Sequence, residues 1–154
     1  GTGSRLMAQY TSKPGIVSRP PYELYMGFAD MRSLVERLPE DKRTGVTADF
    51  DSIHGNFKGF DLGVKVSERR PYSRIELVDD GAPFHFTVSL HFDATPAGDA
   101  GKTDFWIEVD PDLNFFMRQM IGSKISDALD KIVAGLVAVS EGRMPEGVDP
   151  SMFK

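Results

Sequence analysis

The sequence predicts an α+β fold in which a curved antiparallel β-sheet wraps around one long C-terminal α-helix, with two short helices after the first strand. Two patterns lead to this prediction. From Leu113 to Ser140, apolar residues recur every three or four positions, which is the period of one helix face. From Gly45 to Val109, apolar and polar residues mostly alternate, which is the period of strands with one buried face. Strands with one apolar face need a cover, and the long helix supplies it.

The C-terminal helix has marked ends. Asp110-Pro111-Asp112 offers a capping carboxylate and a proline that suits a first turn, and Glu141-Gly142 is a stop signal. A helix of this length spans about 40 Å. Val133 and Val137 widen its apolar stripe, so its middle is expected to be deeply buried. The stripe consists of Leu113, Met117, Met120, Ile121, Ile125, Ala128, Leu129, Ile132, Leu136 and Val139.

Two glycines, Gly122 and Gly135, lie inside this helix. Each costs about 1 kcal/mol relative to alanine, which calls for a reason. The favoured interpretation is close packing against a neighbouring strand or loop. The alternative is that Gly122 leaves space for a ligand beside Met117, Met120 and Ile125.

The N-terminal part predicts one strand and two short helices. The strand covers Ala8–Ser18, and Pro14-Gly15 interrupts it. A proline-led helix covers Pro21–Ala29. A second helix, capped by Asp30, covers Met31–Leu38.

The later strands are separated by turn-forming residues. Turns are expected at His54-Gly55-Asn56, Lys58-Gly59, Arg69-Arg70-Pro71 and Asp79-Asp80-Gly81, with a loop at 96–102. The alternation assigns many large side chains to the core. The aromatic and methionine residues expected to point inward are Tyr22, Tyr25, Met26, Phe28, Phe50, Phe60, Phe84, Phe86, Phe92, Phe105, Phe116, Met117 and Met120.

Composition narrows the class of protein. A chain of 154 residues with a net charge of −5 predicts one domain and argues against nucleic acid as a partner. It has no cysteine and three scattered histidines, so we expect no metal and no cofactor. Charges interrupt the long helix, which argues against insertion in a membrane. With no signal peptide evident, a cytoplasmic location is expected.

Three segments are expected along the chain. Residues 1–6, GTGSRL, resemble the scar of an expression tag before Met7. A single domain covers 7–140. Residues 141–154 form a polar tail, a loose or docking segment.

Four stretches carry a resemblance to a known family. They are PPYELYMGFADM, GVKVSERRPYSRIEL, FHFTVSLHF and TDFWIEVDPDLNFFMRQMIGSKISDALDKIVAGL. In this order they resemble the START-like, or SRPBCC, superfamily with its helix-grip fold, and most closely its bacterial polyketide cyclase/dehydrase and lipid-transport members. The resemblance covers about Ala8 to Ser140. It implies a cavity between sheet and helix that holds lipids, sterols or polyketides, and it transfers no catalytic signature.

The leading hypothesis is therefore the binding of a hydrophobic small molecule or lipid in this cavity, without catalysis. One alternative is a cyclase/dehydratase-type enzyme acting on a polyketide-like substrate, which needs at least two polar side chains in the cavity. The inward aromatic set also fits an ordinary filled core. The candidate lining residues are Tyr22, Tyr25, Met26, Phe50, Phe60, Phe86, Leu90, Phe105, Ile107, Phe116, Met117, Met120 and Ile121. No catalytic or metal-binding residue is assigned.

The polar residues of the strands are expected on the outer face. By alternation, His85 and His91 are solvated strand residues, and His54 is a loop residue. Five carboxylates, those of Asp49, Asp51, Asp104, Glu108 and Asp110, are expected on the same solvated face. An outward Trp106 suggests a further alternative, an interaction module that uses this face, with a homodimer as one form of it.

Overall fold

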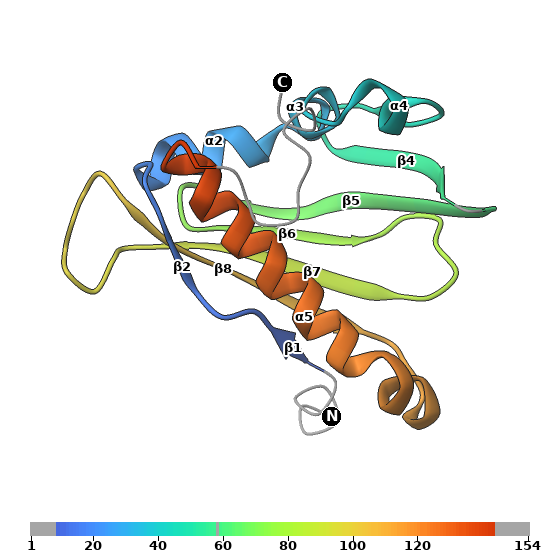
Figure 1. Cartoon of the computed structure of the whole chain (residues 1–154). Helices are drawn as coiled ribbons and strands as arrows, with labels where there is room; N and C mark the ends of the chain where they lie inside the picture. The colour runs from blue at the N-terminus through green and yellow to red at the C-terminus, as the bar shows by residue number, and fades with distance from the viewer. Residues whose placement is uncertain (1–8, 58, 144–154) are drawn as a thin grey trace.

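The computed structural model describes residues 9–57 and 59–143. Within these residues, eight strands form one antiparallel sheet in the order β1-β8-β7-β6-β5-β4-β3, and β2 also pairs with β8. The sheet curves behind the long helix α5, and the short helices lie at one end of the molecule (Figure 1). The predicted α+β helix-grip fold is confirmed. The elements are β1 (Tyr10–Thr11), β2 (Gly15–Val17), α2 (Pro21–Ala29), α3 (Met31–Glu36), α4 (Glu40–Arg43), β3 (Thr47–Ala48), β4 (Ser52–Phe57), β5 (Phe60–Arg70), β6 (Arg74–Asp79), β7 (Phe86–Asp93), β8 (Thr103–Pro111) and α5 (Phe115–Ser140).

The N-terminal elements follow their local signals. The expected interrupted strand is present as β1 and β2, which both pair antiparallel with β8. Helix α2 has proline at its first position, and Asp30 caps α3 by accepting a hydrogen bond from the Arg32 backbone N–H at 3.0 Å. The short α4 was not predicted from the sequence.

The turn expected at His54-Gly55-Asn56 is wrong. These residues lie inside β4, where Gly55 is opposite Leu62 in the ladder with β5. The turn falls later, at Gly59, whose φ of +85° is open to glycine with little strain. Because Gly59 already supplies the reversal, Gly55 serves as an ordinary strand position.

One contiguous core lies between the inner face of the sheet, α2, α3 and α5. Its aromatic centre is Phe28, Phe92 and Phe105, whose ring centroids lie 5.4 to 6.0 Å apart. The buried core residues are Val17, Leu24, Tyr25, Ala29, Met31, Ile75, Leu77, Leu90, Phe92, Phe105, Ile107, Leu129 and Val133.

Helix α5 begins later than predicted. Pro111 is the last residue of β8, opposite Phe86, so the expected cap at residues 110–112 is wrong. The cap is Asn114, whose side chain accepts a hydrogen bond from the Met117 backbone N–H at 2.8 Å. The sheet ladder extends through β8 to residue 111 and leaves only three residues before the helix. The predicted stop is confirmed, because Glu141 is the C-cap.

The buried face of α5 is rotated from the predicted stripe. Gly122, Leu129 and Val133 are buried, whereas Met120 and Ile132 are exposed. The helix packs on β1, β2 and β8, so only the side toward these strands is covered. The predicted burial of the middle of the helix is therefore confirmed for one face only.

Two glycines allow this close contact. A Cβ atom on Gly122 would lie 3.0 Å from the hydroxyl oxygen of Tyr10 in β1, which confirms the close-packing interpretation. On the strand side, a Cβ atom on Gly15 would lie 2.7 Å from methyl groups of both Val133 and Val137. The helix therefore sits directly on the backbone of β2.

We predict that Gly15→Ala lowers the free energy of unfolding by about 1 to 3 kcal/mol, because the added methyl overpacks the contact with α5. The measurement is chemical denaturation. Gly101→Ala is the control, since its Cβ would meet only Asp99 Oδ1, at 3.4 Å. In a Val133→Ala background the effect of Gly15→Ala should shrink, because one of the clashing methyl groups is gone. An equal loss in both backgrounds contradicts this account.

Candidate binding pocket

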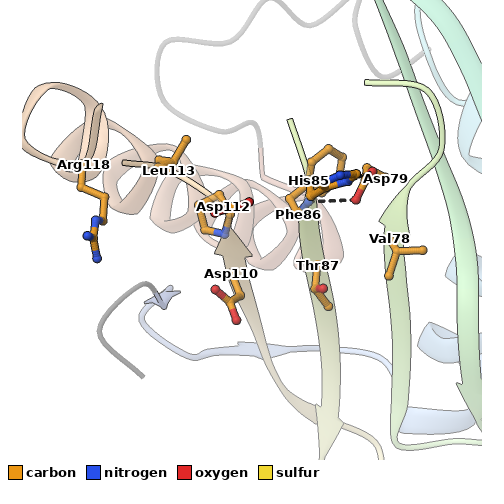
Figure 2. Close-up of a pocket in the computed structure, with 10 residues that line it drawn as sticks. Val78, Asp79, His85, Phe86, Thr87, Asp110, Asp112, Leu113 and Arg118 are labelled. Carbon is orange, nitrogen blue, oxygen red and sulfur yellow. Dashed lines mark hydrogen bonds and ion pairs between the residues drawn. The ribbon is translucent and has the colours of Figure 1, made fainter. Parts of the chain in front are cut away.

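At one end of the sheet, three elements end or begin beside one another: β6 ends, β7 begins, and β8 leads into α5. A pocket of about 460 Å³ lies here, within the range of small-molecule sites. Figure 2 shows Arg118 and Leu113 on one side of it and the pair Asp79–His85 on the other. The lining residues are Val78, Asp79, His85, Phe86, Thr87, Asp110, Pro111, Asp112, Leu113 and Arg118.

The apolar part of the pocket continues the inner face of the sheet. Phe86 and Pro111 lie opposite each other in the β7–β8 ladder. The next pair of inner residues, Val88 and Val109, packs against the core. The pocket therefore opens from the same face that α5 covers farther along.

A carboxylate–histidine pair forms one polar side. Asp79 Oδ1 accepts a hydrogen bond from the Phe86 backbone N–H at 2.9 Å, and its Oδ2 lies 2.8 Å from His85 Nδ1. The bond from the Phe86 N–H, followed by that from His85, lowers the pKa of Asp79. The hydrogen bond to Asp79 and the charge of this carboxylate raise the pKa of His85. The pair therefore favours a carboxylate beside an imidazolium.

Arg118 forms the opposite polar side. It lies in the first turns of α5, and its Nε atom is buried without a hydrogen-bond partner. Among the described residues, no ion pair or side-chain hydrogen bond of Arg118 is found. Arg118 is half-buried and faces the strand ends that form the rest of the pocket. Asp110 and Asp112 lie between Arg118 and His85 in Figure 2.

A second charged residue reaches the inner face through a β-bulge. The register between β5 and β6 shifts between Val66 and Glu68, so Arg69 lies opposite the buried Ile75. Without the bulge, the alternation would place Arg69 on the outer face.

Arg69 acts as a structural clamp. Its guanidinium donates hydrogen bonds to the carbonyl oxygens of Ala29 and Phe50, at 2.9 and 2.8 Å, and to Asp51 Oδ1 at 2.6 Å. It also lies 4.0 Å from the centroid of the Phe50 ring. Because these contacts join the end of α2 to residues 50–51, we assign Arg69 a structural role.

A larger hollow of about 790 Å³ lies around residues 36–44. One continuous segment lines it, and its walls are mainly charged residues with Leu38 and Pro39. No residue outside 36–44 lines it. The pocket beside α5 is therefore the better candidate site.

The predicted lining residues fall into four groups. Tyr25, Leu90, Phe105 and Ile107 are buried in the core, and only Phe86 lines the described pocket. Ile121 is half-buried. The remaining residues are exposed; they are Tyr22, Met26, Phe50, Phe60, Phe116, Met117 and Met120. Their role as ligand contacts stays a prediction.

The outer face is less solvated than predicted. His85 is open, with 84% of its side chain exposed. His91 is only 16% exposed, so its assignment as a solvated residue is wrong. Trp106, its cross-strand partner, stacks on it with centroids 3.7 Å apart and an interplanar angle of 4°. The Trp106 indole N–H also donates to Asp93 at 2.8 Å, which holds the ring flat on the sheet.

Two of the predicted outer carboxylates, those of Asp104 and Glu108, lie on the outer face as expected. Asp104 and Glu108 are half-buried on the outer face, and burial, with the charge of Asp93 as a smaller cause, raises the pKa of Asp104. The prediction that His54 is a loop residue is wrong: it lies in β4, with its Nε2 atom 2.6 Å from Asp80 Oδ2.

Sequence reasoning missed Asp79, Asp112 and Arg118 as pocket residues. Asp79 carried a usable signal, because it continues the inward alternation of Ile75 and Leu77. The other two depend on where β8 ends and α5 begins.

Over residues 9–57 and 59–143, no helix is long and apolar enough to cross a membrane. The same part of the chain contains no group of three or more histidine or carboxylate side chains that could hold a metal ion.

No protein-family model matches the chain, and no curated protein matches it. Several solved structures match the chain. A protein from Thermobifida fusca is 13% identical, with 88% of this chain and 95% of that chain covered and a TM-score of 0.64. CalU16 from Micromonospora echinospora is 12% identical, with 90% and 76% covered and a TM-score of 0.51. An HSP90 activator from Plasmodium falciparum is 14% identical, with 77% and 89% covered and a TM-score of 0.51.

The likeness shows a shared fold. That fold is a curved antiparallel sheet with a long C-terminal helix.

We predict that His85 titrates above the ordinary histidine pKa and that Asp79→Asn returns its pKa toward that value, because the hydrogen bond to the carboxylate is the main cause of the increase. The measurement is an NMR titration of the imidazole signals, with Asp99→Asn as a remote control. A raised pKa in the folded state stabilises the fold at low pH and stops doing so as pH rises through it. An unchanged titration in Asp79→Asn contradicts the assignment.

Proposed function

We propose that the protein is a START-like protein that binds a hydrophobic small molecule or lipid between the sheet and α5, without catalysis. The observation that carries this proposal is the apolar surface left uncovered on β5 and on the first turns of α5. On the inner face of β5, Phe60 is 61% exposed and Leu62 is also exposed; on α5, Met117 and Met120 are exposed. Apolar surface of this kind gains about 25 cal/mol for each Å² that a ligand covers.

The position of α5 explains why this surface is open. The main contacts of the helix are with β1, β2 and β8, the strands at one end of the sheet order. Strands β4 and β5 belong to the other half of the sheet. A ligand that lies along the start of α5 and reaches toward β5 would complete the cover of the inner face.

The pocket offers both apolar and charged groups, and its lining is more polar than that of most ligand sites. Ligand sites are mostly apolar, with a few polar groups that orient the ligand. Here Phe86, Pro111 and Leu113 supply apolar contacts, and Asp79–His85 and Arg118 supply polar ones. Methionines at the start of α5 suit irregular ligand shapes, because their side chains adapt.

An enzyme of the cyclase/dehydratase type is the second candidate. The Asp79–His85 pair favours it, because a histidine oriented by a carboxylate can transfer protons. His85 is largely open to solvent, however, whereas such chemistry gains from a site that excludes water. Binding without catalysis is therefore the better-supported function.

An interaction role for the outer face rests on Trp106. Its ring is already engaged by His91 and Asp93, so it offers a partner less free surface than an outward tryptophan alone would. A homodimer through this face remains the third candidate.

We predict saturable binding of the apolar dye N-phenyl-1-naphthylamine, measured by its fluorescence. Met117→Ser should weaken it by about fivefold, because apolar contact with the dye is lost. Val139→Ser is the matched control: Val139 is also 38% exposed, but it lies at the far end of α5. Binding that does not saturate, or equal weakening in both variants, contradicts the proposal.

A complementary measurement is native mass spectrometry of protein purified from its own host. A co-purifying mass of lipid size is the expected result. The same mass should be depleted in Met117→Ser and retained in Val139→Ser.

A further inference from the structure

We infer that Met117 and Met120 form a modification site, at which a peroxide oxidises the thioethers to sulfoxides and thereby weakens the binding of the apolar ligand. The inference rests on the proposed function and adds a form of regulation to the same surface. It begins with the sulfur content of the chain. The sequence contains seven methionines and no cysteine, so methionine is the residue type that offers sulfur to an oxidant.

Exposure separates the methionines in the described part of the chain. Met31 is 0% exposed. By contrast, Met117 and Met120 in α5 are 38% and 54% exposed, and Met26 in α2 is 60% exposed. Because oxidation requires that the oxidant reach the sulfur atom, peroxide meets these three side chains and is kept from Met31.

Position separates Met117 and Met120 from Met26. The first two are three residues apart in α5, so their side chains are neighbours on the helix surface. They belong to the first turns of this helix, which the proposed ligand covers together with β5. Met26 lies in α2, a different helix. Oxidation at the start of α5 therefore alters the ligand surface, and oxidation of Met26 leaves that surface as it was.

The reaction needs the protein and one molecule of hydrogen peroxide for each methionine. A lone pair of the thioether sulfur attacks one peroxide oxygen, the O–O bond breaks and an S–O bond forms. The sulfur is oxidised to the sulfoxide, and the other peroxide oxygen is reduced and leaves as water. The sulfoxide is polar. Covering it with an apolar ligand therefore costs desolvation, whereas covering the thioether is favourable.

The fold does not depend on these two thioethers. Neither methionine belongs to the buried core or to the partly buried residues packed against it. The start of α5 uses the backbone N–H of Met117, which donates to the Asn114 side chain at 2.8 Å, and not the Met117 side chain. Oxidation therefore changes the binding surface while the helix and the core stay in place.

The test measures binding of N-phenyl-1-naphthylamine before and after treatment with hydrogen peroxide, and peptide mass spectrometry locates the added oxygen. We expect the wild-type protein to lose affinity by about fivefold, with oxygen on Met117 and Met120 and none on Met31. A double variant, Met117→Leu with Met120→Leu, keeps an apolar side chain of similar volume without sulfur. After treatment it should retain the affinity of its own untreated form. Met26→Leu is the matched control and should lose as much affinity as the wild type.

Reversal provides a second measurement. Methionine sulfoxide reductases convert the sulfoxide back to the thioether. Treatment of the oxidised wild-type protein with these enzymes should restore its affinity for the dye. Affinity that stays lost after both methionines have been reduced overturns the inference.

The outcomes also separate this inference from the proposed function. An unchanged affinity after Met117 and Met120 have been oxidised overturns the inference, and the apolar binding site stands. An equal loss in the double leucine variant overturns it as well, because another residue then causes the loss. Loss of affinity only when oxygen also appears on Met31 overturns it in favour of unfolding. If the untreated wild-type protein does not bind the dye, the proposed function itself fails.

Discussion

The close approach between α5 and strands β1 and β2 is the contact on which the rest of the structure depends. Gly15 and Gly122 remove the side chains that would hold helix and strands apart. The Lys13 N–H reinforces the contact by donating to Asp130 Oδ1 at 2.7 Å. Both N-terminal strands pair with β8, and β8 leads into α5. In the sheet, β8 therefore lies between the N-terminal strands and β7, and in the chain it comes directly before α5.

The same contact creates the candidate site. A helix seated at the β1–β2–β8 edge cannot also cover β5, so Phe60 and Leu62 remain exposed. It also brings Arg118 against the ends of β7 and β8, where Asp79 holds His85 and the start of β7. The exposed apolar surface and the polar groups of the pocket therefore both follow from the packing of α5 on β1, β2 and β8.

Small departures from regular strand geometry decide where charges go. The bulge in β5 moves Arg69 to the inner face, where it ties α2 to residues 50–51. On the outer face, cross-strand register places Trp106 over His91, which covers a histidine that alternation alone would leave in water. Neither effect has a local signature, because a bulge and a register depend on the partner strand.

The amino-acid sequence by itself determined the fold class, the interrupted first strand, the bounds of α2 and the end of α5. These follow from periodicity, proline and capping residues, which act within a few positions. Only the tertiary structure decided the start of α5, the rotation of its buried face and the charged lining of the pocket. The ladder between Phe86 and Pro111 extends β8 beyond its expected end, and the seat on Gly15 selects the covered face. Both are contacts between distant parts of the chain, whose free energies outweigh local preference.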